Sequence, residues 1–181
     1  MESIWARAFN FHNCESTWIN IYKQKIISVN VVKIAEFNFK VLHNIIPCGK
    51  ILNKWQVHIS DKCESCNQIE TTEHMLYSCN KITSIWEKVS LVLKMNIKWK
   101  NIVCGLPSSE NSKNVCFLNF AISKLSIYKH NNLFKRKKIK LNQKVEIMIM
   151  RDLLMHKEIL KCKNDNIFND VRFEILLEYM S

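Results

Sequence analysis

Glycine and proline are scarce in this sequence, with two of each among 181 residues. Tight turns between short strands draw on these two residues, so their scarcity argues against a fold of many hairpins. We therefore predict a mostly α-helical protein. The 48% of hydrophobic residues is enough for a packed core, in one domain or in two small ones.

Long apolar runs are absent as well. No segment reaches the about 18 apolar residues of a membrane-spanning helix, and residues 1–11 lack the uninterrupted apolar segment of a signal peptide. We expect an intracellular protein, in the nucleus or the cytoplasm, without a membrane partner. In a reducing compartment the eight cysteines would be thiols or metal ligands rather than disulfides. They stand at positions 14, 48, 63, 66, 79, 104, 116 and 162.

Catalytic patterns are missing too. The four aspartates stand at positions 61, 152, 165 and 170, and no two of them are adjacent. Polymerases and nucleases that use two metal ions need clustered carboxylates. The sequence also has no glycine-rich phosphate loop and no Gly-x-Ser-x-Gly turn. We predict no catalytic residues and no small-molecule substrate, which means that the chain is not an enzyme by itself.

The segment from Cys63 to Cys79 carries the most specific motif. Two residues separate Cys63 from Cys66, and four residues separate His74 from Cys79. Zn²⁺ takes thiolate and imidazole ligands in a tetrahedron, and a Cys-x2-Cys turn can bring both sulfurs to one ion. Four protein ligands leave no position for an activated water, so we predict a structural zinc site formed by Cys63, Cys66, His74 and Cys79.

Other interpretations of these residues stay open at this point. The thiols could be buried in the core, or Cys63 and Cys66 could form a redox pair. Cys48 and His58 could compete as ligands, although neither has a closely spaced partner.

Helical periodicity indicates the elements around the motif. Four segments have apolar residues at helical spacing: a short one over Trp18–Tyr22, and residues 31–46, 48–55 and 80–93. Thr71 or Thr72 can cap a helix that carries His74 in its first turn. Pro47 is expected to end the helix before it, although residues 36–41 also alternate in a way that allows a strand. Trp86 is expected in the core rather than at a base-stacking surface.

The composition changes near residues 104–114. This stretch contains Gly105, Pro107 and three serines with few apolar residues, which is typical of a surface connection. We therefore predict a zinc-binding helical domain at residues 1–96, a linker at 97–114 and a basic C-terminal helical segment at 115–181. Helices of that segment are expected near residues 118–130, 141–161 and 169–180, forming a small C-terminal helical bundle.

Positive charge is concentrated in the same C-terminal segment. The net charge is +11, and residues 111–151 contain ten basic residues and one acidic residue. The many lysine, isoleucine and asparagine residues have A/T-rich codons, so the placement of charge is more informative than its total. Five basic residues cluster together: Lys135, Arg136, Lys137, Lys138 and Lys140. Such a cluster predicts salt-dependent binding of RNA or DNA, although a solvated loop or a nuclear-import signal has the same composition.

The cysteine and histidine motif resembles the zinc-binding domain that follows the polymerase in reverse transcriptases of non-LTR (LINE-type) retrotransposons. The resemblance covers residues 18–93. Its specific part is Cys63-x2-Cys66, then Glu70-Thr71-x-x-His74-x4-Cys79 and Trp86. Residues 37–42 and Leu52-x2-Trp55 resemble two helices of the family. The resemblance implies a zinc-stabilised helical module that holds template RNA or target DNA, with the four ligands named above.

Three functions are compatible with these features. The first is non-catalytic nucleic-acid binding by a module derived from the C-terminal end of a retrotransposon reverse transcriptase. The second is a protein-interaction module, with a reverse transcriptase or another protein as its partner. The third is a retroelement remnant without a selected function. Within the module, Tyr77 could contact a base or pack against the helix that follows it.

Overall fold

The computed structural model describes residues 2–10, 18–19, 21–22, 32–57, 60–106, 123–129 and 145–162. This part of the chain is mostly helical and contains no strand; one isolated bridge pairs Lys62 with Ile69. The prediction of a mostly α-helical protein is confirmed. None of the described helices is long and apolar enough to cross a membrane.

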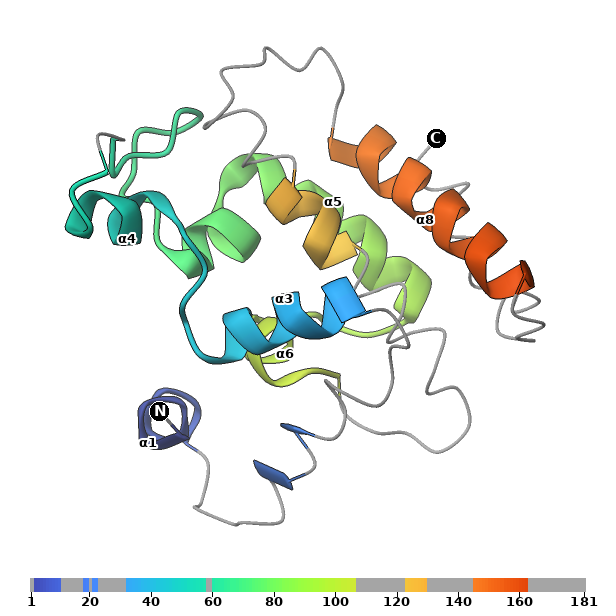
Figure 1. Cartoon of the computed structure of the whole chain (residues 1–181), viewed down its shortest axis with the longest axis horizontal. Coiled ribbons are helices and arrows are strands. Elements are labelled where there is room, and N and C mark those ends of the chain that lie inside the picture. The colour runs from blue at the N-terminus through green and yellow to red at the C-terminus, as the bar shows by residue number, and fades with distance from the viewer. Residues whose placement is uncertain are drawn as a thin grey trace.

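The named helices follow in chain order as α1 (Glu2–Phe9), α3 (Val32–Leu42), α4 (Gly49–Lys54), η1 (His74–Ser78), α5 (Asn80–Leu93), α6 (Trp99–Cys104) and α8 (Val145–Cys162). Residues 18–19, 21–22 and 123–129 are also helical. Figure 1 shows α5 in the middle of the molecule, α3 beside α6, and α8 and α1 on opposite sides. In the described part of the chain the other helices thus lie around α5.

One large hydrophobic cluster extends from α3 to α8. It contains side chains of α3, α5 and α6 together with those of residues 123–129 and α8. Cys63 and Cys79 of the metal motif belong to the same cluster. A second cluster packs Trp5, Trp18 and Ile21 of the N-terminal segments against Leu42 and its neighbours. The helices expected to form a C-terminal bundle therefore share their core with the metal-binding half.

Helix α5 agrees with its prediction. The residues that were expected to line one face are all buried: Ile82, Ile85, Trp86, Val89 and Leu93. The indole N–H of Trp86 donates to the carbonyl oxygen of Leu76 at 2.7 Å. The expectation that Trp86 lies in the core is confirmed.

Helix α3 ends earlier than predicted, and a strand at residues 36–41 is wrong because these residues are helical. The helix ends at Leu42, and Asn44 has a left-handed φ of 51°. The N–H groups of Ile45 and Asn44 donate to the carbonyl oxygens of Lys40 and Val41. This pair of bonds is the Schellman arrangement that closes a helix. Asn44, not Pro47, terminates α3.

Two helices were not predicted. Helix α1 buries Trp5, whose indole N–H donates to the carbonyl oxygen of Leu42 at 2.7 Å. Helix α6, in the expected linker at residues 97–114, buries Ile102 and Val103 and contacts α3. The helix expected at residues 169–180 lies outside the described residues.

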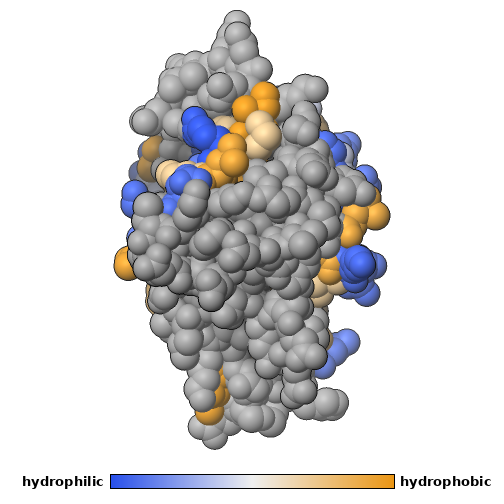
Figure 2. All heavy atoms as spheres, turned by 90° about the vertical axis from the view of Figure 1, so that its right-hand side faces the viewer, coloured by the Kyte–Doolittle hydropathy of each residue, from blue (hydrophilic) through white to orange (hydrophobic). Residues whose placement is uncertain are grey.

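The last described helices pack against each other through polar groups as well as the core. Asp152 of α8 accepts hydrogen bonds from Ser126 and Lys129, each at 2.8 Å. On the side of the molecule that carries α8, hydrophobic and hydrophilic side chains lie next to each other at the surface (Figure 2). Helix α8 itself exposes Ile147, Leu154 and Met155.

Candidate metal centre

The first two candidate ligands lie in the metal loop, which we define as residues 60–73. The loop closes on itself because the N–H of Cys63 donates to the carbonyl oxygen of Gln68 at 2.7 Å and that of Asn67 donates to the carbonyl oxygen of Cys63 at 2.8 Å. Asn67 has a φ of 58°, in the left-handed region that asparagine tolerates. The tight turn expected of Cys63 and Cys66 is present.

The other two candidate ligands lie at the ends of a single π-helical turn. The N–H of Cys79 donates to the carbonyl oxygen of His74 at 3.1 Å, which is a bond between residues five apart. In an α-helix these two residues would point about 140° apart, since each residue rotates the chain by about 100°. A π turn brings residues five apart over each other. The spacing of four residues between His74 and Cys79 therefore matches this local structure.

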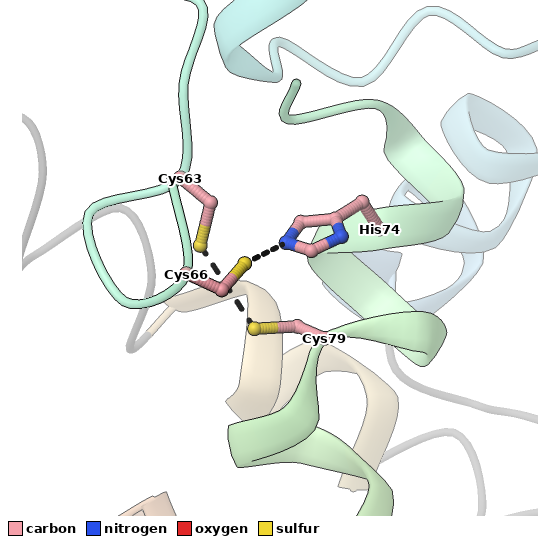
Figure 3. A group of neighbouring side chains, drawn as sticks. All are labelled: Cys63, Cys66, His74 and Cys79. Atoms are coloured by element: carbon pink, nitrogen blue, oxygen red, sulfur yellow. Dashed lines mark hydrogen bonds between the residues drawn. The ribbon is translucent and has the colours of Figure 1, made fainter. Parts of the chain in front are cut away.

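The four side chains converge on one point (Figure 3). The sulfur of Cys63 lies 3.9 Å from that of Cys79, and the sulfur of Cys66 lies 3.2 Å from Nε2 of His74. All four candidate ligand atoms lie within 4.8 Å of one another. Cys63, His74 and Cys79 are buried, and Cys66 is partly exposed. The group could hold a metal ion.

The distances agree with a tetrahedral ion. Zinc–sulfur bonds of about 2.3 Å and zinc–nitrogen bonds of about 2.0 Å place two sulfurs about 3.8 Å apart and a sulfur and a nitrogen about 3.5 Å apart. The observed 3.9 Å between sulfurs is close to this value, and the observed 3.2 Å to the imidazole is slightly shorter. Three soft thiols and one imidazole are also the donor set of structural zinc sites.

Burial and hydrogen bonding shift the pKa of three of the four candidate ligands. Burial raises the pKa of Cys79 to about 11, and the neighbouring Cys63 adds to the shift. Burial also acts to raise the pKa of Cys63, but hydrogen bonds from the backbone N–H groups of Ser65 and Cys66 stabilise its thiolate and the net shift is downward. Burial lowers the pKa of His74, so its imidazole is neutral at pH 7 and able to bind a metal.

The competing ligands considered from the sequence do not join the group. Cys48 is buried at the start of α4, where its sulfur accepts a hydrogen bond from the hydroxyl of Thr72 at 3.9 Å. Cys104 is buried as well, so both behave as small core residues, as expected. His58 lies outside the described residues. A redox pair of Cys63 and Cys66 would not account for the two further ligands beside it.

Glu70 supports the metal loop in a way that the sequence did not reveal. Its side chain is 7% exposed, and one carboxylate oxygen accepts the N–H of Gly49 at 2.7 Å. Its carbonyl oxygen accepts the N–H of Lys50 at 3.0 Å. The hydroxyl of Thr71 accepts the N–H of His74 at 3.0 Å, which confirms the predicted cap. The sequence offered only a glutamate just before a predicted helix start, and it gave no sign that this side chain is buried.

The side chain of Tyr77 packs against Ile97 and Trp99. Its hydroxyl donates to the carbonyl oxygen of Ile97 at 3.2 Å, and its ring lies 6.4 Å from that of Trp99. The same ring lines one wall of an open groove of about 960 Å³ along α5. The apolar lining of this groove is formed by Tyr77, Trp86, Leu91, Met95 and Ile97.

The predicted nucleic-acid contacts are not among the described residues. Lys135, Arg136, Lys137, Lys138 and Lys140 all fall between residue 129 and residue 145. Their role stays a prediction.

The metal loop and its helices define a small metal-binding module, and comparison with known proteins gives its family. Residues 1–86 match the family described as zinc-binding in reverse transcriptase. The resemblance seen in the sequence is confirmed. The family is a zinc-binding domain and not the catalytic polymerase domain. Searches of curated proteins and of solved structures each found no match.

Proposed function

We propose that this protein is a non-catalytic, zinc-stabilised nucleic-acid-binding module, derived from the C-terminal end of a retrotransposon reverse transcriptase. The observation that carries the proposal is the convergence of three cysteines and one histidine inside the segment that matches the zinc-binding family. Four protein ligands fill a tetrahedral sphere, so the ion stabilises the fold and activates no water.

The positive charge of the chain is the reason for proposing a nucleic acid as the ligand. The chain carries a net charge of +11, and a strongly basic protein attracts polyanions. The basic residues of 135–140 are the proposed phosphate contacts, which would give binding that depends on salt more than on sequence. A reverse transcriptase that holds its template or target needs such a contact.

The first test is the metal content of purified wild-type protein and of Cys66→Ser, with circular dichroism before and after chelation. We expect about one zinc per chain in the wild type, and in the variant loss of the metal together with the part of the helical signal that comes from η1. A folded wild-type protein without zinc would refute the metal part of the proposal.

The second test is titration of RNA and DNA at several salt concentrations. Affinity should fall steeply as salt rises, and it should weaken when the five basic residues of 135–140 are replaced by glutamine. Unchanged affinity after this replacement would remove that segment from the binding site.

The groove along α5 favours a second candidate function, a zinc-stabilised protein-interaction module. Leu91 is 65% exposed at its edge, and Trp86 and Ile97 are buried beneath it. Apolar grooves of this kind suit the apolar side chains of a protein partner. A wild-type protein that binds neither RNA nor DNA at low salt would favour this candidate.

A further inference from the structure

The surface of α4 carries an unusual tryptophan. Trp55 follows the last residue of the helix and is 57% exposed, although the sequence pattern suggested a residue that packs with Ile51 and Leu52. The other tryptophans in the described part of the chain are buried or half-buried: Trp5, Trp18, Trp86 and Trp99. A large indole ring held at the surface is a feature of binding sites, because it offers much contact area with little loss of side-chain entropy.

Trp55 directly follows Lys54 in the sequence, and Lys50 stands four residues before Lys54. Lys50 and Lys54 are both exposed and are separated by one helical turn, so their side chains leave the same side of α4. Within the described part of the chain neither lysine forms an ion pair. Residues 49–57 contain no aspartate or glutamate, so positive charge is not neutralised within this segment.

This surface is fixed to the metal loop. Glu70 accepts the N–H groups of both Gly49 and Lys50, one with its carboxylate and one with its carbonyl oxygen. The orientation of α4 therefore depends on a residue that lies between the two ligand pairs. Glu64 and Glu73 of the metal loop are exposed carboxylates that disfavour a phosphate near them.

We propose that the α4 face, formed by Lys50, Lys54 and Trp55, is a contact for single-stranded nucleic acid. Trp55 stacks on an unpaired base, and the two lysines contact the flanking phosphates. Stacking on an exposed aromatic ring next to cationic side chains is how proteins bind single strands without reading sequence. The inference rests on the proposed function and places a strand on the zinc module itself, apart from the basic segment at 135–140.

The cationic charge favours a nucleic acid over a protein at this face. An apolar protein partner would gain from Trp55 alone, but it would have to cover two lysines that form no ion pair with any described residue. A single strand uses all three side chains, with a base on Trp55 and phosphates on the two lysines. The groove along α5 differs in this respect, because its lining contains Glu87 as well as Lys94.

The test compares single substitutions in the zinc-loaded full chain, titrated with an oligouridylate and an oligothymidylate of equal length. Trp55→Ala should weaken binding by about tenfold or more, and Trp55→Phe should restore most of it, since phenylalanine also stacks. Lys54→Gln should lower the slope of log affinity against log salt by about 0.7, the value for one phosphate contact on a single strand.

Lys33→Gln is the matched control, because Lys33 is an exposed lysine on α3 and its loss changes the net charge by the same amount. It should leave the salt slope unchanged. Metal content and circular dichroism should not differ among the variants, since the substituted side chains are exposed. The two oligonucleotides decide between RNA and DNA as the source of the strand.

Two results would overturn the inference in distinguishable ways. If wild type binds and Trp55→Ala binds equally well, the α4 face is not the contact, while the proposed function stands. If wild type binds neither oligonucleotide at low salt, the inference and the nucleic-acid part of the proposed function both fail, and the exposed tryptophan is left to a protein partner.

Discussion

The metal loop and the helices around it are stabilised in different ways. Between residues 60 and 69 only Cys63 is buried, so this part of the loop has almost no hydrophobic core. Helix α5 buries five apolar side chains along one face, and each contributes about 1.5–3 kcal/mol when removed from water. The helices can therefore hold their fold by packing, whereas the loop depends on its ligands and a few backbone hydrogen bonds.

The largest effect should come from removing the metal. Binding of a structural zinc ion contributes about 10 kcal/mol or more in small zinc modules, and the loop has little else to replace it. Chelation is expected to abolish hydrogen-exchange protection in residues 60–78 and to leave that of α5 largely intact. Hydrogen exchange measured by mass spectrometry with and without chelator tests this difference.

Cys48→Ser is the control for Cys79→Ser in the same experiment. Both cysteines are buried, but only Cys79 belongs to the ligand group. Cys79→Ser should reproduce the effect of chelation, and Cys48→Ser should keep both metal and protection. Equal protection of the loop in every sample would mean that the metal does not stabilise it.

The second effect concerns the helical core. Ile85→Ala removes a side chain that is 1% exposed on α5, and truncation of a buried isoleucine costs about 2–5 kcal/mol. Leu91→Ala on the exposed side of the same helix should cost less than about 0.5 kcal/mol. Urea unfolding of the zinc-loaded variants measures both. A similar shift in the two midpoints would contradict the assignment of α5 as the core helix.

The third effect lies where the two regions meet. Glu70→Ala leaves the N–H of Gly49 without its acceptor, and a buried hydrogen bond to a charged group contributes about 1.5–3 kcal/mol. Glu70→Gln keeps an oxygen at this position and should lose less. Glu73→Ala removes an exposed carboxylate from the same loop and should change stability little. Urea unfolding together with metal content separates the loss of this link from loss of the metal.

If Glu70→Ala keeps its zinc and its stability, the metal loop and α4 are joined by packing alone. If it loses zinc as readily as Cys79→Ser, the glutamate positions His74 for the ion rather than only fastening α4. Either result decides whether the metal loop and the helices around it fold independently.

The features that could be predicted from the sequence are those that depend on long or regular patterns of residues. The stripe of α5 is unbroken over almost four turns, so its period identified the helix and Trp86 as a core residue. The ligand group followed from spacing, since Cys63 and Cys66 must share a turn and His74 and Cys79 can share a helical turn. Such patterns are local, and the physics that produces them is local too.

Other features depend on distant contacts and could not be predicted. Helix α6 has six residues and forms where Ile102 and Val103 can pack beside α3. Trp55 has the spacing of a core residue, yet its side chain is 57% exposed. The end of α3 was assigned to Pro47, because asparagine tolerates the left-handed conformation but also occurs in many other positions, so Asn44 was only a weak signal. The π turn between His74 and Cys79 is recognised by the hydrogen bond between these two residues, and the periodicity of apolar residues does not reveal it.

The smallest effect concerns left-handed residues that are not glycine. Lys94 closes α5 with a φ of 51°, and Asn67 closes the Cys63 turn with a φ of 58°. The left-handed conformation costs a residue such as lysine about 1 kcal/mol, whereas asparagine adopts it with little strain. Lys94→Gly should therefore stabilise the protein by about 0.5 kcal/mol, after the greater entropy of glycine in the unfolded chain is subtracted.

Asn67→Gly should have almost no effect in the zinc-loaded protein, because the ligands hold the turn and the asparagine is not strained. Thermal unfolding of the zinc-loaded variants measures both changes. A gain at Asn67 as large as that at Lys94 would mean that the metal loop stores backbone strain. Part of the free energy of metal binding would then offset strain in the turn, and the metal loop would not be a relaxed structure that the ligands only hold in place.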